Sequence, residues 1–220
     1  MKLDFLHRTF ASSFFAAVLC FSKAQASLLL EQWQGGGAGF GGLAGADAAI
    51  AGRLADASGY YSIIDFTDDP GGFAGEIPGS VPWPLDPAND DFAARVSGLL
   101  SITTADTYYF RTYADDGVRL RVNGTTIIED DSYHPEIPLV GSIFLGPGTY
   151  AIDLVFFEGG GEASLEFSMA QGSAEGPYGH VGNFEGTTTA AVPEASTWLA
   201  GAVLVGMAGA GRLCQRLRRH

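Results

Sequence analysis

Hydrophobic and polar residues alternate with a period of two through much of the segment from residue 92 to residue 169. This alternation is the signature of β-strands with one face in a core and the other in water. The apolar rows are Phe92, Ala94, Val96, Gly98, Leu100 and Ile102; Val118, Leu120 and Val122; Tyr150, Ile152, Leu154 and Phe156; and Ala163, Leu165, Phe167 and Met169. At least six strands with short links predict an all-β fold, an antiparallel β-sandwich or barrel.

Turn signals and flanking segments complete this prediction. Asn123-Gly124 predicts a tight hairpin, because a type I′ turn needs positive φ at both central residues. Leu28 to Trp33 predicts a first strand, and Ala46 to Ala57 a short helix. Arg119 and Arg121 alternate with the apolar row 118–122, so they are expected on the solvent face of their strand.

The two ends differ from the middle in composition. Residues 1–26 combine Lys2 and Arg8, an apolar run and Ala24-Gln25-Ala26, which predicts a signal peptide cleaved after Ala26. Residues 27–170 are expected to form the β domain, 171–191 a linker, and 192–220 a tail with a C-terminal apolar helix. The apolar stretch 198–211 would span roughly 21 Å as a helix, short of a bilayer core of about 30 Å.

The tail resembles a PEP-CTERM sorting signal. The match is the stretch "VPEASTW", an Ala/Gly-rich apolar helix and a basic cluster, with Ala195 where that family usually has proline. The residues concerned are Val192, Pro193 and Glu194 of the motif, and Arg212, Arg216, Arg218 and Arg219 of the cluster. The resemblance implies a Gram-negative bacterium, transient anchoring in the inner membrane and cleavage by an exosortase. The mature protein would then reach the cell surface or the extracellular polysaccharide matrix. A plain membrane anchor is the alternative.

The charge and the cysteine content of the chain restrict the kinds of function and of stabilisation that it can have. The net charge is −13, but between residues 27 and 192 five arginines face 23 acidic residues and there is no lysine. Such a surface repels phosphate backbones and attracts cations, which argues against nucleic-acid binding. Cys20 and Cys214 both lie in segments expected to be removed, so the mature domain is predicted to contain no disulfide.

The β segment resembles the protective-antigen-type β-sandwich domain found in adhesins, glycosidases and toxins. The matching pieces are "FAARVSGLLSI", "DTYYFRTYADDGVRLRVNGTTIIED" and "GSIFLGPGTYAIDLVFFEGGGEASLEF". In sugar-binding members of that family, an adjacent Asp pair joined by a cis peptide holds a calcium ion, which in turn holds sugar hydroxyls. The resemblance therefore implies calcium ligands at Asp115 and Asp116. Further ligands would come from a later loop, for which the candidates by position are Glu158, Glu162, His180 and Asn183.

Elementary chemistry supports two interpretations of the Asp pair. Two adjacent carboxylates repel each other unless a cation neutralises them, and Ca²⁺ favours hard oxygen ligands. Asp-Asp-Gly is also good turn chemistry, because Asp accepts local backbone hydrogen bonds and Gly117 tolerates positive φ. The predicted function is an exported, non-catalytic carbohydrate-binding or adhesive module. A purely structural matrix protein is the alternative, and a glycan-processing enzyme is a remote third, since no opposed carboxylate pair stands out.

Overall fold

The computed structural model describes residues 27–35, 39–69, 74–84, 91–184 and 187–190, so the expected signal peptide and sorting tail lie outside it. Within these residues, no helix has both the length and the apolar character needed to cross a membrane. The elements are β1 Leu28–Gln34, α1 Leu43–Gly52, β2 Ala57–Tyr61, β3 Asp65–Thr67, β4 Phe92–Ile102, β5 Asp106–Asp115, β6 Val118–Val122, β7 Thr125–Asp130, β8 Ile137–Leu145, β9 Gly148–Glu158, β10 Ser164–Gln171, β11 Gly179–His180, the 3₁₀ helix η1 Val181–Asn183 and β12 Thr187–Ala190.

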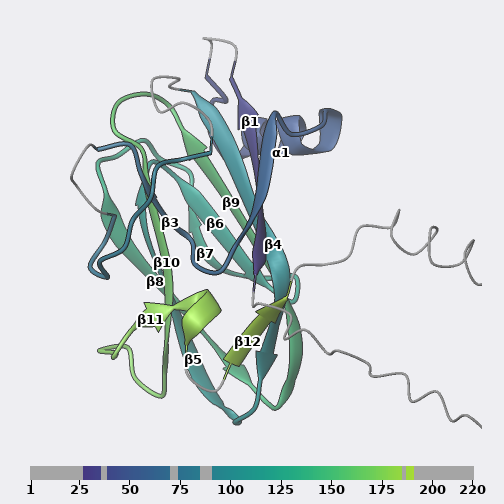
Figure 1. Cartoon of the computed structure of the whole chain (residues 1–220), viewed down its shortest axis with the longest axis vertical. Helices are drawn as coiled ribbons and strands as arrows, with labels where there is room; N and C mark the ends of the chain where they lie inside the picture. Colours follow the sequence, from purple (N-terminus) through teal and green to yellow (C-terminus); the bar gives the residue numbers. More distant parts are fainter. Residues whose placement is uncertain (1–26, 36–38, 70–73, 85–90, 185–186, 191–220) are drawn as a thin grey trace, which may run out of the picture.

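Two antiparallel sheets pack face to face (Figure 1). The seven-stranded sheet has the order β2-β1-β4-β9-β6-β7, with β12 also paired to β4. The five-stranded sheet has the order β11-β10-β5-β8, with β3 also paired to β10. The predicted antiparallel β-sandwich is thus confirmed. Asn123 and Gly124 have φ of 49° and 82°, as the predicted hairpin turn requires.

The inward rows of both sheets form one hydrophobic core, and their facing agrees with the predicted alternation. Leu120, Leu154 and Phe167 are fully buried in it. Trp83, from the connection between β3 and β4, inserts at one end and stacks on Phe66 with ring centroids 5.0 Å apart. The core therefore includes a side chain that no strand supplies.

Helix α1 covers part of the outer face of the seven-stranded sheet, and this corrects the expectation for Arg119. Leu43 and Ala46 pack on the outward residues Val155 and Phe157 of β9. Asp47 does not act as a helix cap. Its carboxylate pairs with the Arg119 guanidinium through bonds of 2.6 and 2.9 Å. Arg119 is consequently buried instead of solvated, because the helix lies over the sheet face from which its side chain projects.

Arg119→Ala is therefore expected to lower the free energy of unfolding by about 1–2 kcal/mol, since it removes two charge-assisted hydrogen bonds to a half-exposed partner. Arg121→Ala is the matched control. Arg121 is less buried and donates a single hydrogen bond to the Thr126 hydroxyl, so its loss should cost under about 0.5 kcal/mol. Denaturant melts of both variants measure the difference, and equal costs would contradict the ion pair.

The segment expected as a linker, 171–191, contributes to both sheets where the structure describes it. β11 pairs with β10, and β12 pairs with the end of β4 from Leu99 to Ile102. Val181 and Gly182 of η1 are buried. The apolar periodicity of these pieces is too short to be recognised, because β11 has two residues and β12 four. The described part of this segment therefore belongs to the sandwich.

Candidate functional site

Three connections cross from one sheet to the other at the same end of the sandwich. β5 passes to β6 through Asp116 and Gly117, β7 passes to β8 through residues 131–136, and β9 passes to β10 through residues 159–163. They are neighbours because β6 pairs with both β7 and β9, and β5 pairs with both β8 and β10. Asp115 is thus the last residue of β5, and Asp116 begins the corner between the two sheets.

Asp115 and Asp116 are joined by a cis peptide bond, as the family resemblance implied. The Asp116 carboxylate is buried and accepts two backbone hydrogen bonds, from the N–H of His134 at 2.7 Å and from that of Gly159 at 2.9 Å. The Asp116 carboxylate therefore links the β5–β6 connection to the β7–β8 connection and to the β9–β10 connection. Gly117 does not have positive φ. It is needed because a Cβ there would lie 2.3 Å from the Phe157 ring.

Glu158, one of the four loop candidates, completes a group of three carboxylates. Asp115, Asp116 and Glu158 each offer an oxygen within 4.8 Å of the others. Glu158 is 1% exposed. One of its oxygens accepts the Gly160 N–H at 2.5 Å, while the other is buried and has no hydrogen-bond partner among the described residues. A buried carboxylate oxygen without a partner is costly.

The electrostatics of the group reflect this crowding. Burial raises the pKa of Glu158 to about 8, and the nearby Asp116 and Asp115 charges raise it further against the opposing hydrogen bond from Gly160. Burial and the Asp116 charge raise the pKa of Asp115 to about 6. Both shifts mean that negative charge is unfavourable here without a compensating cation.

The donor set fits a hard divalent cation. Three carboxylates supply oxygen ligands only, and the unpartnered Glu158 oxygen is available to a metal. No cysteine lies among the described residues, and His134 and His180 are not part of the group. Calcium takes 6 to 8 oxygen ligands, so backbone carbonyls, water or a bound hydroxyl would supply the rest.

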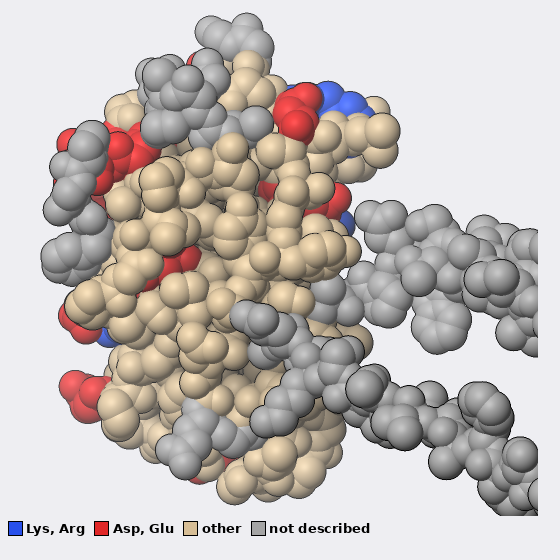
Figure 2. Space-filling model, in the orientation of Figure 1, with Lys and Arg blue, Asp and Glu red and all other residues tan. Residues whose placement is uncertain are grey.

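A pocket of about 290 Å³ opens beside Asp115. It is lined by Thr67, Asp69, Asp115, Pro135, Glu136, Glu162 and Ser164. Glu162 therefore faces this pocket although it is outside the carboxylate group. Four of the residues lining the pocket are acidic, and Figure 2 shows scattered acidic patches and few basic side chains on the visible face. A hydroxyl-rich ligand in this pocket would lie next to an ion held by Asp115.

The other two loop candidates have different roles. The His180 Nε2 lies 3.0 Å from an Asp65 carboxylate oxygen, in a buried pair of the five-stranded sheet. Asn183 ends η1 and is exposed. His134, which the sequence did not single out, borders the site through its backbone N–H. In the sequence, Glu158 is recognisable as a candidate because it follows an apolar strand-forming row and precedes the glycines 159–161, where a loop is expected.

Comparison with known proteins agrees with this architecture. The PA14 domain family model matches residues 55–182, more than half of the 220 residues. A structure described as the PA14 sugar-binding domain from an RTX adhesin is 26% identical, with a TM-score of 0.57, covering 71% of this chain and 95% of that one.

Two further solved structures share the fold. The PA14 domain of the antifreeze protein MpAFP is 16% identical with a TM-score of 0.58, covering 74% of this chain and 90% of that one. The Epithelial Adhesin 9 A domain from Candida glabrata, solved with Galb1-3GlcNAc, is 11% identical with a TM-score of 0.54, covering 74% and 88%. No curated protein matches the chain. The family match and the β-sandwich together show that the chain belongs to the PA14 domain family.

Proposed function

We propose that this chain is an exported, non-catalytic glycan-binding module in which a calcium ion held by Asp115, Asp116 and Glu158 binds sugar hydroxyls. The observation that carries the proposal is the convergence of these three carboxylates, with one buried Glu158 oxygen lacking a hydrogen-bond partner. A cation would neutralise the group and occupy that oxygen. The pocket beside Asp115 would receive the sugar.

The similar structures support the glycan part of the proposal. One is described as a sugar-binding domain of an adhesin, and another was solved with a disaccharide. A non-catalytic role is favoured because Asp116 and Glu158 are buried and the oxygens of the three carboxylates lie within 4.8 Å of one another, whereas the two carboxyl groups of a glycosidase flank a scissile bond in an open cleft. The proposed setting is the cell surface or polysaccharide matrix, reached through the signal peptide and exosortase processing of the tail.

A glycan array tests the proposal. Wild-type protein is expected to bind a subset of glycans in millimolar calcium and to lose that binding in excess chelator. Asp115→Asn should lose it even with calcium, because one ligand charge is removed while the amide oxygen can still accept the Glu136 backbone N–H. Binding that is identical with calcium and with chelator would contradict the ion's role. No calcium-dependent binding to any glycan would favour the structural matrix protein.

A further inference from the structure

A second pocket lies on the outer face of the five-stranded sheet, away from the three crossing connections. Its volume is about 470 Å³, and its lining includes Glu76, Ile77, Arg111, Glu175, Pro177 and Tyr178. It shares no lining residue with the pocket beside Asp115. Arg111 precedes Asp115 by four residues on β5, a separation of about 13 Å along a strand. The two pockets therefore belong to different parts of the sheet.

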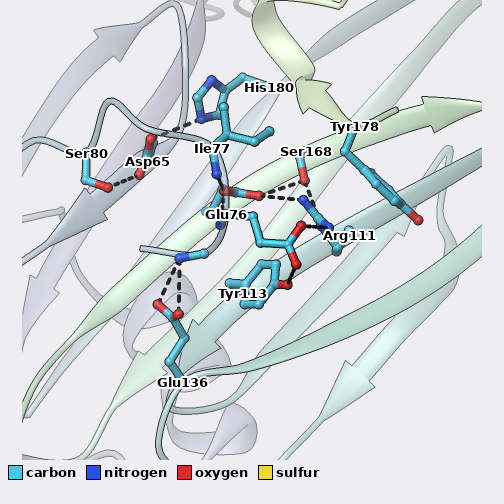
Figure 3. A network of polar contacts seen from close by, with 12 residues as sticks. Asp65, Glu76, Ile77, Ser80, Arg111, Tyr113, Glu136, Ser168, Tyr178 and His180 are labelled. Atoms are coloured by element: carbon cyan, nitrogen blue, oxygen red, sulfur yellow. Dashed lines mark hydrogen bonds and ion pairs between the residues drawn. The ribbon is translucent and has the colours of Figure 1, made fainter. Parts of the chain in front are cut away.

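Arg111 lines this pocket, and its side chain lies within a network of polar contacts (Figure 3). Its side chain is 8% exposed, and its guanidinium lies 4.0 Å from the ring centroid of Tyr178 and 4.9 Å from that of Tyr113. Hydrogen bonds to Glu76, Glu166 and Ser168 use three of its N–H groups. A guanidinium has five such donors, so one N–H on Nη1 and one on Nη2 have no hydrogen-bond partner among the described residues.

The acidic neighbours outnumber Arg111. Glu166 is fully buried and accepts the backbone N–H groups of Glu76 and Ile77, which fixes the wall of the pocket. The Glu76 carboxylate accepts hydrogen bonds from the Tyr113 hydroxyl and from Arg111, and these hold its pKa below the usual range. The exposed Glu175 carboxylate has no partner among the described residues. The pocket lining has one cation, Arg111, against the carboxylates of Glu76 and Glu175, and the buried Glu166 paired with Arg111 adds a third negative charge behind it.

We propose that this pocket binds a sugar unit that carries a free amine, without calcium. The ammonium group would pair with Glu175 and Glu76, and ring hydroxyls would accept the spare N–H groups of Arg111. Tyr178 and Pro177 supply apolar surface for the C–H faces of the sugar, and the volume suits one or two sugar rings. The charge selects the amine: an acidic sugar would be repelled, and an N-acetylated one would lose the ion pair.

Isothermal titration calorimetry of the full chain in excess chelator tests this second site. The probes are the tetramer of glucosamine and the tetramer of N-acetylglucosamine, at a pH where the free amine is protonated. The glucosamine tetramer is expected to bind at least tenfold more tightly than the acetylated one. Glu175→Gln should weaken it about tenfold, which corresponds to about 1.4 kcal/mol. Glu129→Gln, an exposed change on the other sheet, is the matched control and should leave binding unchanged.

The result separates this site from the calcium site. Asp115→Asn should leave amine-dependent binding intact while it removes calcium-dependent binding, and Glu175→Gln should do the reverse. Equal affinity for the two tetramers, or wild-type affinity in Glu175→Gln, would overturn the proposal. So would the loss of all glucosamine binding in chelator, because the ligand would then depend on the calcium site.

Discussion

Millimolar calcium is expected to raise the thermal stability of the protein, and by more at pH 8 than at pH 5. An ion that binds the folded state and not the unfolded chain stabilises by about 2.7 kcal/mol at a hundredfold excess over its dissociation constant. For a domain of this size, that is a rise of about 5–10 °C in the melting temperature. Calorimetry or circular dichroism melts with calcium and with chelator, at several pH values, give the measurement.

The direction of the pH effect follows from the raised pKa values. Without the ion, the pKa of Glu158 is about 8 in the folded state against an ordinary value of 4.5 in the unfolded chain, and the pKa of Asp115 is about 6 against 3.8. Between those values the folded state binds more protons than the unfolded state, so stability falls as the pH rises. A bound cation favours the ionised carboxylates. Calcium should therefore abolish the decrease in stability with rising pH, and the stabilisation by calcium should increase over the same pH range.

Glu158→Gln separates an ion site from a plain turn. It removes one charge of the group but keeps an oxygen to accept the Gly160 N–H. The variant is expected to be at least as stable as wild type in chelator, since carboxylate repulsion is relieved, and to lose most of its response to calcium. Glu162→Gln is the control, because Glu162 lines the adjacent pocket without joining the carboxylate group. If calcium does not change the melting temperature of the wild-type protein, the Asp-Asp-Gly sequence forms a turn and does not bind an ion.

The parts of the fold that could be predicted are those encoded over short stretches of sequence. The period-two rows on β4, β6, β9 and β10 and the Asn123-Gly124 turn depend on neighbouring residues, so they could be identified directly. The adjacent Asp115 and Asp116 were visible for the same reason. Strand β5 ends at Asp115, so the pair lies where the chain leaves the strand to cross between the sheets.

What could not be predicted depends on long-range packing. Glu158 is 42 residues from Asp116 and joins it because β6 and β9 pair, a register that no local pattern specifies. Arg119 alternates like a solvent-facing residue, but α1 covers that face. The pocket at Arg111 requires the loop before β4 and the segment after β10 to meet on one sheet face.

Trp83→Ala is expected to cost about 3–5 kcal/mol of the free energy of unfolding, as truncations of large buried aromatics do. Trp83 is 4% exposed, and its ring lies 4.8 Å from that of Phe92 and 5.2 Å from that of Phe156. Its indole N–H donates to the Ala163 carbonyl at 3.1 Å. Urea denaturation measures the cost, with Leu54→Ala as the control, since Leu54 is 92% exposed and should change stability by less than about 0.5 kcal/mol.

Trp83→Phe isolates the hydrogen bond from the packing. Phenylalanine keeps most of the aromatic contact but removes the indole donor, while the Ala163 carbonyl still accepts the Asp68 backbone N–H at 3.1 Å, so the cost is about 0.5–1.5 kcal/mol. Ala163 ends the connection that begins after Glu158, so this bond also ties the core to the carboxylate group. Trp83→Phe should therefore reduce the stabilisation by calcium as well as the stability itself. An unchanged calcium response would show that the connection after Glu158 keeps its position without Trp83.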